Sequence, residues 1–209
     1  MFSSLSFAGE VYDKFPEQIE AYEKYVFYSH GFIVEGTYPT PNNERWGVYD
    51  FPAIKESLAD SHYNLIAYHR PKGTDPFVHA KSLASDVRKL LKKGVAANHI
   101  TIIGFSRGAF ITSLTSHYLE ETPVNTVLLA GCGRIVSNKY SDIKMNGAFL
   151  SIYETTDGAV TCEKLRNRSP KLTSFDEISI TTGEEHGAFY RPMSEWVVPL
   201  KKWVVEKSS

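Results

Sequence analysis

The sequence has few cysteines and no long hydrophobic run. Its 209 residues include only Cys132 and Cys162, and no Cys or His spacing of the kind that binds zinc. No apolar run approaches the roughly 20 residues needed to span a bilayer. The first residues, MFSSLSFAGEVYDKF, lack the basic start and long apolar segment of a signal peptide. We therefore expect a cytoplasmic protein with no membrane span, no disulfide framework and no metal.

Neither sign of charge is in excess. The 23 Lys and Arg residues are balanced by 24 Asp and Glu, which gives a formal net charge of −1. A chain without surplus positive charge has no general attraction for phosphate backbones or anionic lipid surfaces. This balance argues against nucleic acid as a partner.

Short apolar runs recur along the chain, with helical segments between them. Most are β-branched or aromatic and do not alternate with polar residues, as expected of strands buried on both faces. The runs are Tyr25–Tyr28, Leu65–Tyr68, Ile100–Phe105, Thr126–Ala130, Phe149–Tyr153 and Ile178–Thr181. Nothing in the chain reads as an interdomain linker. The pattern predicts a single α/β domain over residues 1–209, with a mainly parallel sheet and helices on both faces.

In the segments between these runs, apolar residues recur at helical spacing. It predicts helices over Asp75–Lys93, which stops at Gly94, and over Ser106–Glu120, which closes before Pro123. A further helix is expected over Phe51–Asp60. Residues 36–47 are polar and Pro-rich, which favours a loop. The last helix has one apolar face, made of Trp196, Val197, Leu200, Trp203 and Val204.

The strongest local signal is Gly104-Phe105-Ser106-Arg107-Gly108. It follows a strand pattern and opens a helix, which is where a nucleophilic serine on a sharp, strained turn must sit. Gly104 and Gly108 would let the neighbouring backbones pass close to the turn. The alternative is a glycine-rich strand–helix turn that holds an incidental serine. The context favours Ser106 as a nucleophile.

A second signal, Tyr28-Ser29-His30-Gly31-Phe32, comes directly after another strand. A glycine there allows the chain to turn and present a backbone N–H to a developing oxyanion. We assign this oxyanion hole to the N–H groups of Phe32 and of Arg107, the residue after the serine. For His30 a structural place within the loop is favoured over catalysis.

The general base is expected after the last strand. The segment Thr181-Thr182-Gly183-Glu184-Glu185-His186-Gly187 places a histidine in a loop before the final helix. An imidazole there can take and return the serine proton near neutral pH. We therefore predict His186 as the base.

The carboxylate that orients this base is expected in the loop Glu154-Thr155-Thr156-Asp157-Gly158. Asp157 lies between Ser106 and His186 in the chain, and it would hold the imidazole in the correct tautomer. Asp142, in the preceding connection, and Glu154, at the strand end, remain alternatives.

These motifs together resemble the α/β-hydrolase superfamily, through HGF, GFSRGA, the TTDG turn and GEEHGAFYRP. The correspondence covers nearly everything from about Tyr25 to Val205. It implies the central sheet, the chain order Ser, Asp, His, and ester-type chemistry that requires no cofactor. The usual lid is reduced to Gly131–Gly147, and residues 1–24 leave no room for early antiparallel strands. The chain is thus similar to a small lidless serine esterase or a dienelactone hydrolase, although the latter use a cysteine nucleophile.

The remaining candidates concern the pocket and the cysteines. Phe32, Phe189 and Tyr190 adjoin the proposed loops and are candidates for the substrate pocket. Arg107 is expected to be solvated or ion-paired rather than to bind substrate. Cys132 and Cys162 follow successive strands, and neighbouring loops there would bring them within disulfide distance. Of the two alternatives, two unpaired thiols are favoured over a disulfide.

The sequence therefore predicts a serine hydrolase acting on a small or medium-sized soluble ester through an acyl-enzyme. A binding protein that keeps the hydrolase shape without turnover is one alternative. An acyltransferase or C–C bond hydrolase with the same triad is another, because one fold supports many chemistries.

Overall fold

The computed structural model describes residues 9–36, 38–120 and 122–208. The N-terminal stretch that was compared with a signal peptide lies partly outside these ranges, since residues 1–8 are not described. The same holds for Thr37 of the expected loop. No helix in the described ranges is long and apolar enough to cross a membrane.

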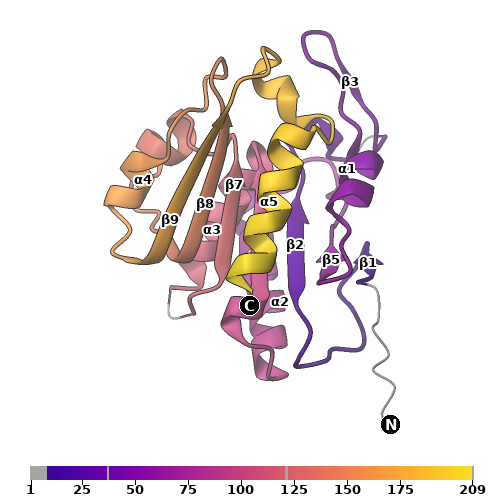
Figure 1. Ribbon diagram of the computed structural model, residues 1–209, viewed down its shortest axis with the longest axis vertical. Coiled ribbons are helices and arrows are strands. Elements are labelled where there is room, and N and C mark those ends of the chain that lie inside the picture. The colour runs from indigo at the N-terminus through magenta and orange to yellow at the C-terminus, as the bar shows by residue number, and fades with distance from the viewer. Residues whose placement is uncertain (1–8, 37, 121, 209) are drawn as a thin grey trace.

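Seven strands form a sheet in which every pairing is parallel. The spatial order is β1-β5-β2-β6-β7-β8-β9 (Figure 1). The strands are β1 (Val11–Tyr12), β2 (Tyr25–Ser29), β5 (Asn64–Ile66), β6 (Ile100–Phe105), β7 (Asn125–Leu129), β8 (Asn146–Glu154) and β9 (Lys171–Ile180). The predicted parallel sheet is confirmed.

Helices cover both faces of this sheet, as predicted. Figure 1 shows α5 crossing in front of the strands and α2 and α3 behind them. Helix α1 lies on the α5 side, where Ile54 and Trp196 share one buried cluster. The helices are α1 (Phe51–Leu58), α2 (Pro76–Lys92), α3 (Arg107–Tyr118), α4 (Glu163–Asn167) and α5 (Ser194–Lys207). Four single turns lie between the strands and helices: η1 (Phe32–Val34), η2 (Ala97–His99), η3 (Ile135–Lys139) and η4 (Glu185–Phe189).

Three differences from the expected elements have local causes. The edge strand β9 begins at Lys171 rather than Ile178, because its first half is only partly buried and carries no continuous apolar run. The strand β1 is two residues long, too short for any periodicity to reveal it. Within the expected loop, β3 (Asn42–Asn43) and β4 (Gly47–Val48) form a small antiparallel hairpin. The Asn43 side chain accepts the N–H groups of Arg45 and Trp46 in its turn.

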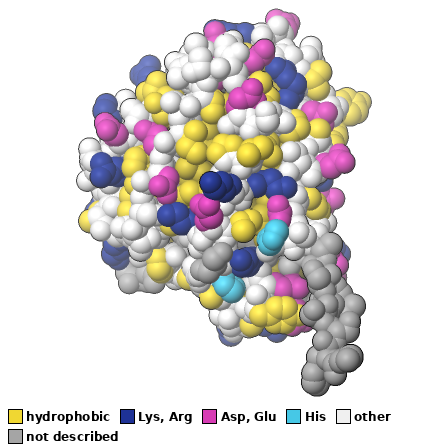
Figure 2. All heavy atoms as spheres, viewed as in Figure 1, with side chains coloured by type: hydrophobic (Ala, Val, Ile, Leu, Met, Phe, Trp, Pro, Cys, Tyr) yellow, Lys and Arg dark blue, Asp and Glu magenta, His cyan; other side chains and the backbone are white. Residues whose placement is uncertain are grey.

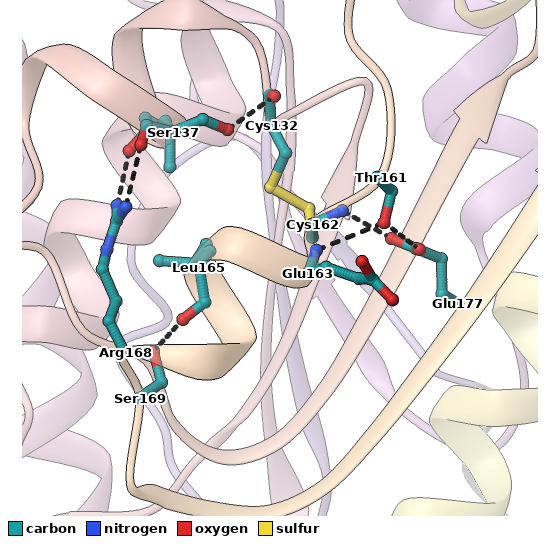
Figure 3. Close-up of a disulfide and its surroundings, with 10 residues drawn as sticks. Cys132, Ser137, Thr161, Cys162, Glu163, Leu165, Arg168, Ser169 and Glu177 are labelled. Atoms are coloured by element: carbon teal, nitrogen blue, oxygen red, sulfur yellow. Dashed lines mark hydrogen bonds between the residues drawn. A yellow bond between two sulfur atoms is a disulfide. The ribbon is translucent and has the colours of Figure 1, made fainter.

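Cys132 and Cys162 are joined in a disulfide, so the expectation of two unpaired thiols is wrong. Their Cα atoms are 5.2 Å apart. They follow β7 and β8, which are neighbours in the sheet, so the loops after these strands meet at one edge. In Figure 3, Glu177 of β9 accepts hydrogen bonds from the Cys162 N–H and the Thr161 hydroxyl. The disulfide and Glu177 together anchor the loop that follows β8.

The segment between β7 and β8 holds only the turn η3, so the described part of the chain contains no separate lid. On the face drawn in Figure 2, cationic and anionic side chains are interspersed with apolar ones. All the loops that carry candidate site residues leave the carboxyl ends of β2, β6, β8 and β9. In an open parallel sheet this is the edge at which ligands bind.

Candidate active site

Ser106 occupies the turn between β6 and α3 in an unusual backbone conformation. Its φ is 54° and its ψ is −115°, a combination that side-chain-bearing residues rarely adopt. The Ser106 N–H donates to the Leu129 carbonyl of β7 at 3.1 Å, and its own carbonyl accepts from Phe110. Both bonds hold the strained turn in place, at the start of a helix whose first N–H groups have no partner within the helix.

The two flanking glycines are required by close backbone contacts. A Cβ on Gly104 would lie 2.3 Å from the Gly108 carbonyl oxygen. A Cβ on Gly108 would lie 1.9 Å from the Ser29 carbonyl oxygen of β2. No side chain fits at either position, because both distances are far below a van der Waals contact. The small residues therefore allow the serine turn to pack directly against the neighbouring strand.

Asp157 and His186 are in direct contact. Asp157 Oδ2 lies 2.6 Å from His186 Nδ1, and the two side chains are 9% and 17% exposed. Asp157 is in the loop after β8, and His186 is in η4 after β9. The imidazole packs between Phe105, at 4.8 Å between ring centroids, and Trp46, at 5.3 Å. These contacts leave Nε2 as the ring nitrogen not engaged by the carboxylate.

The three predicted residues border one cavity of about 600 Å³. Ser106, Asp157 and His186 all line it, together with Phe32 and Arg107. Ser106 and His186 also line a second, smaller cavity of about 270 Å³. The described residues show no hydrogen bond between Ser106 and His186. Hydrogen bonds of this kind are often long in ligand-free structures.

The alternative acids have other surroundings. Asp142 is exposed in a turn. The carboxylate of Glu154 is buried and accepts from the Thr182 and Gly183 N–H groups and from Thr156. Burial alone would raise the pKa of Glu154, but the Thr156 hydroxyl and the backbone N–H groups bring it below its ordinary value. Glu154 thus ties the loop after β8 to the loop after β9.

His30 is buried in the loop after β2. The Arg70 N–H donates to His30 Nε2 at 3.0 Å, so the proton is on Nδ1, which donates to the Gly31 carbonyl at 2.7 Å. Burial, and then the nearby Arg70 charge, lower the pKa of His30 to about 2. His30 is therefore neutral and fully engaged within the loop.

The two cavities share Ser106 and His186 but differ in most of their other lining residues. The larger is bordered by apolar and aromatic side chains from α2, α3, η3 and the residue after η3, which include Phe77, Phe110, Ile135, Val136 and Tyr140. Arg107, Arg134 and Lys139 also line it. The smaller is bordered by Trp46, Tyr49, Phe105 and Tyr190. Phe32 lines both, whereas Phe189 lines neither and is fully buried against Phe105 and Trp196.

Sequence reasoning missed Trp46, which the β3–β4 hairpin brings against His186. The Trp46 ring N–H donates to Glu185 at 3.1 Å, and Glu185 also pairs with Arg45. Gly187 must lack a side chain, since its Cβ would lie 2.8 Å from the Trp46 Cβ. No periodic pattern in residues 36–47 could have revealed this contact.

The described residues contain no group of three or more His, Cys, Asp or Glu side chains that could hold a metal ion.

Comparison with known proteins gives one family and several similar structures. A family model described as phospholipase/carboxylesterase matches residues 78–203. No curated protein matches the chain. Arabidopsis thaliana SOBER1 is 11% identical with a TM-score of 0.58, covering 90% of this chain and 100% of that one. A monoacylglycerol lipase from Paleococcus ferrophilus is 13% identical with a TM-score of 0.59, covering 88% and 94%. A protein from Thermoplasma acidophilum described as a predicted CIB-like hydrolase is 15% identical with a TM-score of 0.57, covering 88% and 86%.

Proposed function

The chain belongs to the phospholipase/carboxylesterase family, with an α/β-hydrolase fold, and from this premise we propose that it is a serine esterase. Ser106 is the nucleophile, His186 the general base and Asp157 the residue that orients the base. The observation that supports this most strongly is that a histidine–carboxylate pair 2.6 Å apart and a strained serine border the same cavity.

The proposed reaction has two steps. His186 removes the Ser106 proton as Oγ attacks the ester carbonyl, and the N–H groups of Phe32 and Arg107 stabilise the oxyanion. His186 then protonates the leaving alcohol, which leaves an acyl group on Ser106. Water, activated by the same imidazole, attacks this acyl-enzyme and releases the acid. Asp157 holds the imidazole tautomer throughout and stabilises the imidazolium without taking the proton.

The cavities indicate the size and character of the substrate. The larger has about 600 Å³ and an aromatic wall, which falls within the about 300–1,000 Å³ typical of sites for organic ligands. Two of the structural neighbours are described as an esterase and a monoacylglycerol lipase, which supports an ester as the substrate. We assign an apolar acyl or alcohol group of medium size to the larger cavity and a smaller group to the cavity beside Trp46.

A series of p-nitrophenyl esters, from acetate to laurate, tests the reaction. A burst of p-nitrophenol followed by steady turnover is expected, with the highest kcat/KM at an intermediate chain length. Added butanol separates hydrolysis from acyl transfer, because a transferase would release the butyl ester in place of the acid. A wild-type protein that binds these esters and hydrolyses none would contradict the proposal.

A further inference from the structure

A buried ion network lies beneath the two loops that carry the proposed oxyanion donors. The Glu35 carboxylate is 2% exposed and its Oε1 meets two arginines, Arg70 Nε at 3.2 Å and Arg107 Nε at 3.0 Å. The Arg70 side chain is fully buried, whereas that of Arg107 is 30% exposed at the cavity wall. One carboxylate oxygen therefore joins residues from three separate segments of the chain.

The Arg70 arm of this network ends on the peptide group that precedes Phe32. Arg70 Nη2 donates to the His30 carbonyl and lies 3.4 Å from the Gly31 carbonyl, which also accepts from His30 Nδ1 at 2.7 Å. The Gly31 carbonyl and the Phe32 N–H belong to one planar peptide unit. Holding the carbonyl on one side therefore aims the N–H on the other.

The Arg107 arm holds the residue that supplies the second donor. Besides Glu35, the Arg107 guanidinium donates to the Thr74 carbonyl at 2.8 Å. Its carbon lies 5.1 Å from the centre of the Phe32 ring. The first residue of α3 and the first residue of η1 are thus linked both through Glu35 and by a direct cation–π contact.

A structural role alone does not account for this arrangement. Glu35 Oε2 and Arg70 Nη1 are buried without a hydrogen-bond partner among the described residues. Buried charges that are incompletely paired seldom stabilise a fold relative to well-packed apolar groups. Preorganisation of the N–H donors for a developing negative charge would explain why the protein keeps a buried network that costs stability.

We propose that Glu35 is a positioning residue that sets the separation and direction of the Phe32 and Arg107 N–H groups through Arg70 and Arg107. This inference rests on the proposed serine esterase function. Neither Glu35 nor Arg70 touches the substrate. An oxyanion forms only as the reaction proceeds, so misplacing the donors lowers kcat and leaves substrate binding nearly unchanged.

The test is a double-mutant cycle with Glu35→Gln and Arg107→Gln, measured as kcat and KM on the best p-nitrophenyl ester. Each single variant is expected to lose roughly tenfold to a hundredfold in kcat, the loss typical of a catalytic group misplaced by about 1 Å. KM should stay within about twofold. The double variant should be no slower than the slower single variant, because both changes cut the same link.

A matched control is Asp86→Asn, which removes another buried carboxylate, held by Lys89 at 2.8 Å and Tyr68 at 2.9 Å. It should lower the melting temperature and leave kcat per folded molecule unchanged.

If Glu35→Gln does not fold, Arg107→Lys replaces it in the test, because Arg107 is at a partly exposed position. Arg107→Lys should lower kcat and leave KM unchanged. Unchanged kcat in folded variants, or additive losses in the double variant, would overturn this proposal alone. A wild-type protein inert toward every ester would overturn the esterase proposal and this one with it.

Discussion

At the scale of single residues, Ser106 is held in a conformation that costs energy. A non-glycine residue with φ of +54° costs about 1–3 kcal/mol, and the surrounding hydrogen bonds from β7 and α3 keep it there. Such strain exposes a side chain at the top of a turn, toward the cavity. The strain at Ser106 should also affect the melting temperature, and this effect can be measured without an activity assay.

Ser106→Gly should raise the melting temperature by about 2–4 °C, since glycine adopts this conformation without strain and the gain is about 1 kcal/mol. Ser106→Ala is the matched control, because it removes the hydroxyl and keeps the strained backbone, and it should melt close to wild type. Differential scanning calorimetry measures both. A glycine variant that melts below the alanine variant would refute the strain.

Asp157→Asn tests the assignment of the acid. It is expected to lower kcat on the order of 10⁴-fold with little effect on folding, because the asparagine favours the wrong imidazole tautomer. Asp142→Asn, an exposed alternative, should retain wild-type kcat. If the Asp142 variant were the slower of the two, the acid would have to be reassigned.

His30 is expected to lower the free energy of unfolding as the pH falls. Its pKa is near its ordinary value of about 6.5 when the chain is unfolded and about 2 in the folded protein. Below about pH 6.5 the unfolded chain therefore binds a proton that the folded chain refuses. The free energy of unfolding should drop by up to about 1.4 kcal/mol per pH unit from this group.

Urea unfolding of wild type and His30→Gln between pH 7 and pH 4.5 measures this effect. The variant should be less stable near neutral pH but should lose stability less steeply as the pH falls. His79, whose pKa burial lowers to about 4, is present in both proteins, so the difference in slope belongs to His30. Parallel curves would contradict the neutral, buried His30.

At the scale of elements, the loops that follow the strands do most to shape the site. The loop after β8 carries Asp157 and ends at Cys162, and the loop after β7 carries Cys132 and η3, which lines the larger cavity. The disulfide between them closes a separation of 30 residues. It thus couples the position of Asp157 to the wall of the cavity.

Replacing both cysteines with serine should lower the free energy of unfolding by about 3–4 kcal/mol, from the loop-closure entropy of a separation of this length. The variant should also lose kcat, because the Asp157 loop loses its covalent tie and is then held only by non-covalent contacts, among them those with Glu177 and Glu154. Urea unfolding and ester hydrolysis report the two effects. A double-serine variant with wild-type stability and turnover would rule out this role for the disulfide.

At the scale of the whole molecule, the sheet was predictable because its central strands are buried on both faces. The runs at Ile100–Phe105 and Thr126–Ala130 therefore read directly as strands. Short elements that contain no continuous apolar run, such as β1, the β3–β4 hairpin and α4, were not predicted, because nothing in their sequence distinguishes them from a loop.

The candidate site was partly predictable for a related reason. Ser106, Asp157 and His186 each follow a recognisable strand, and the carboxyl ends of parallel strands meet at one edge. The pairing of Cys132 with Cys162 depends on how the loops fold. So does the meeting of Glu35, Arg70 and Arg107, which lie in segments with no shared pattern.

The central claim is that Ser106 is a nucleophile activated by His186. The most direct measurement is the intact mass of the protein after treatment with a fluorophosphonate, for wild type, Ser106→Ala and His186→Ala. The account predicts one adduct on wild type and none on either variant. A wild-type protein that stays unlabelled at high probe concentration, or a Ser106→Ala variant that is still labelled, would contradict it.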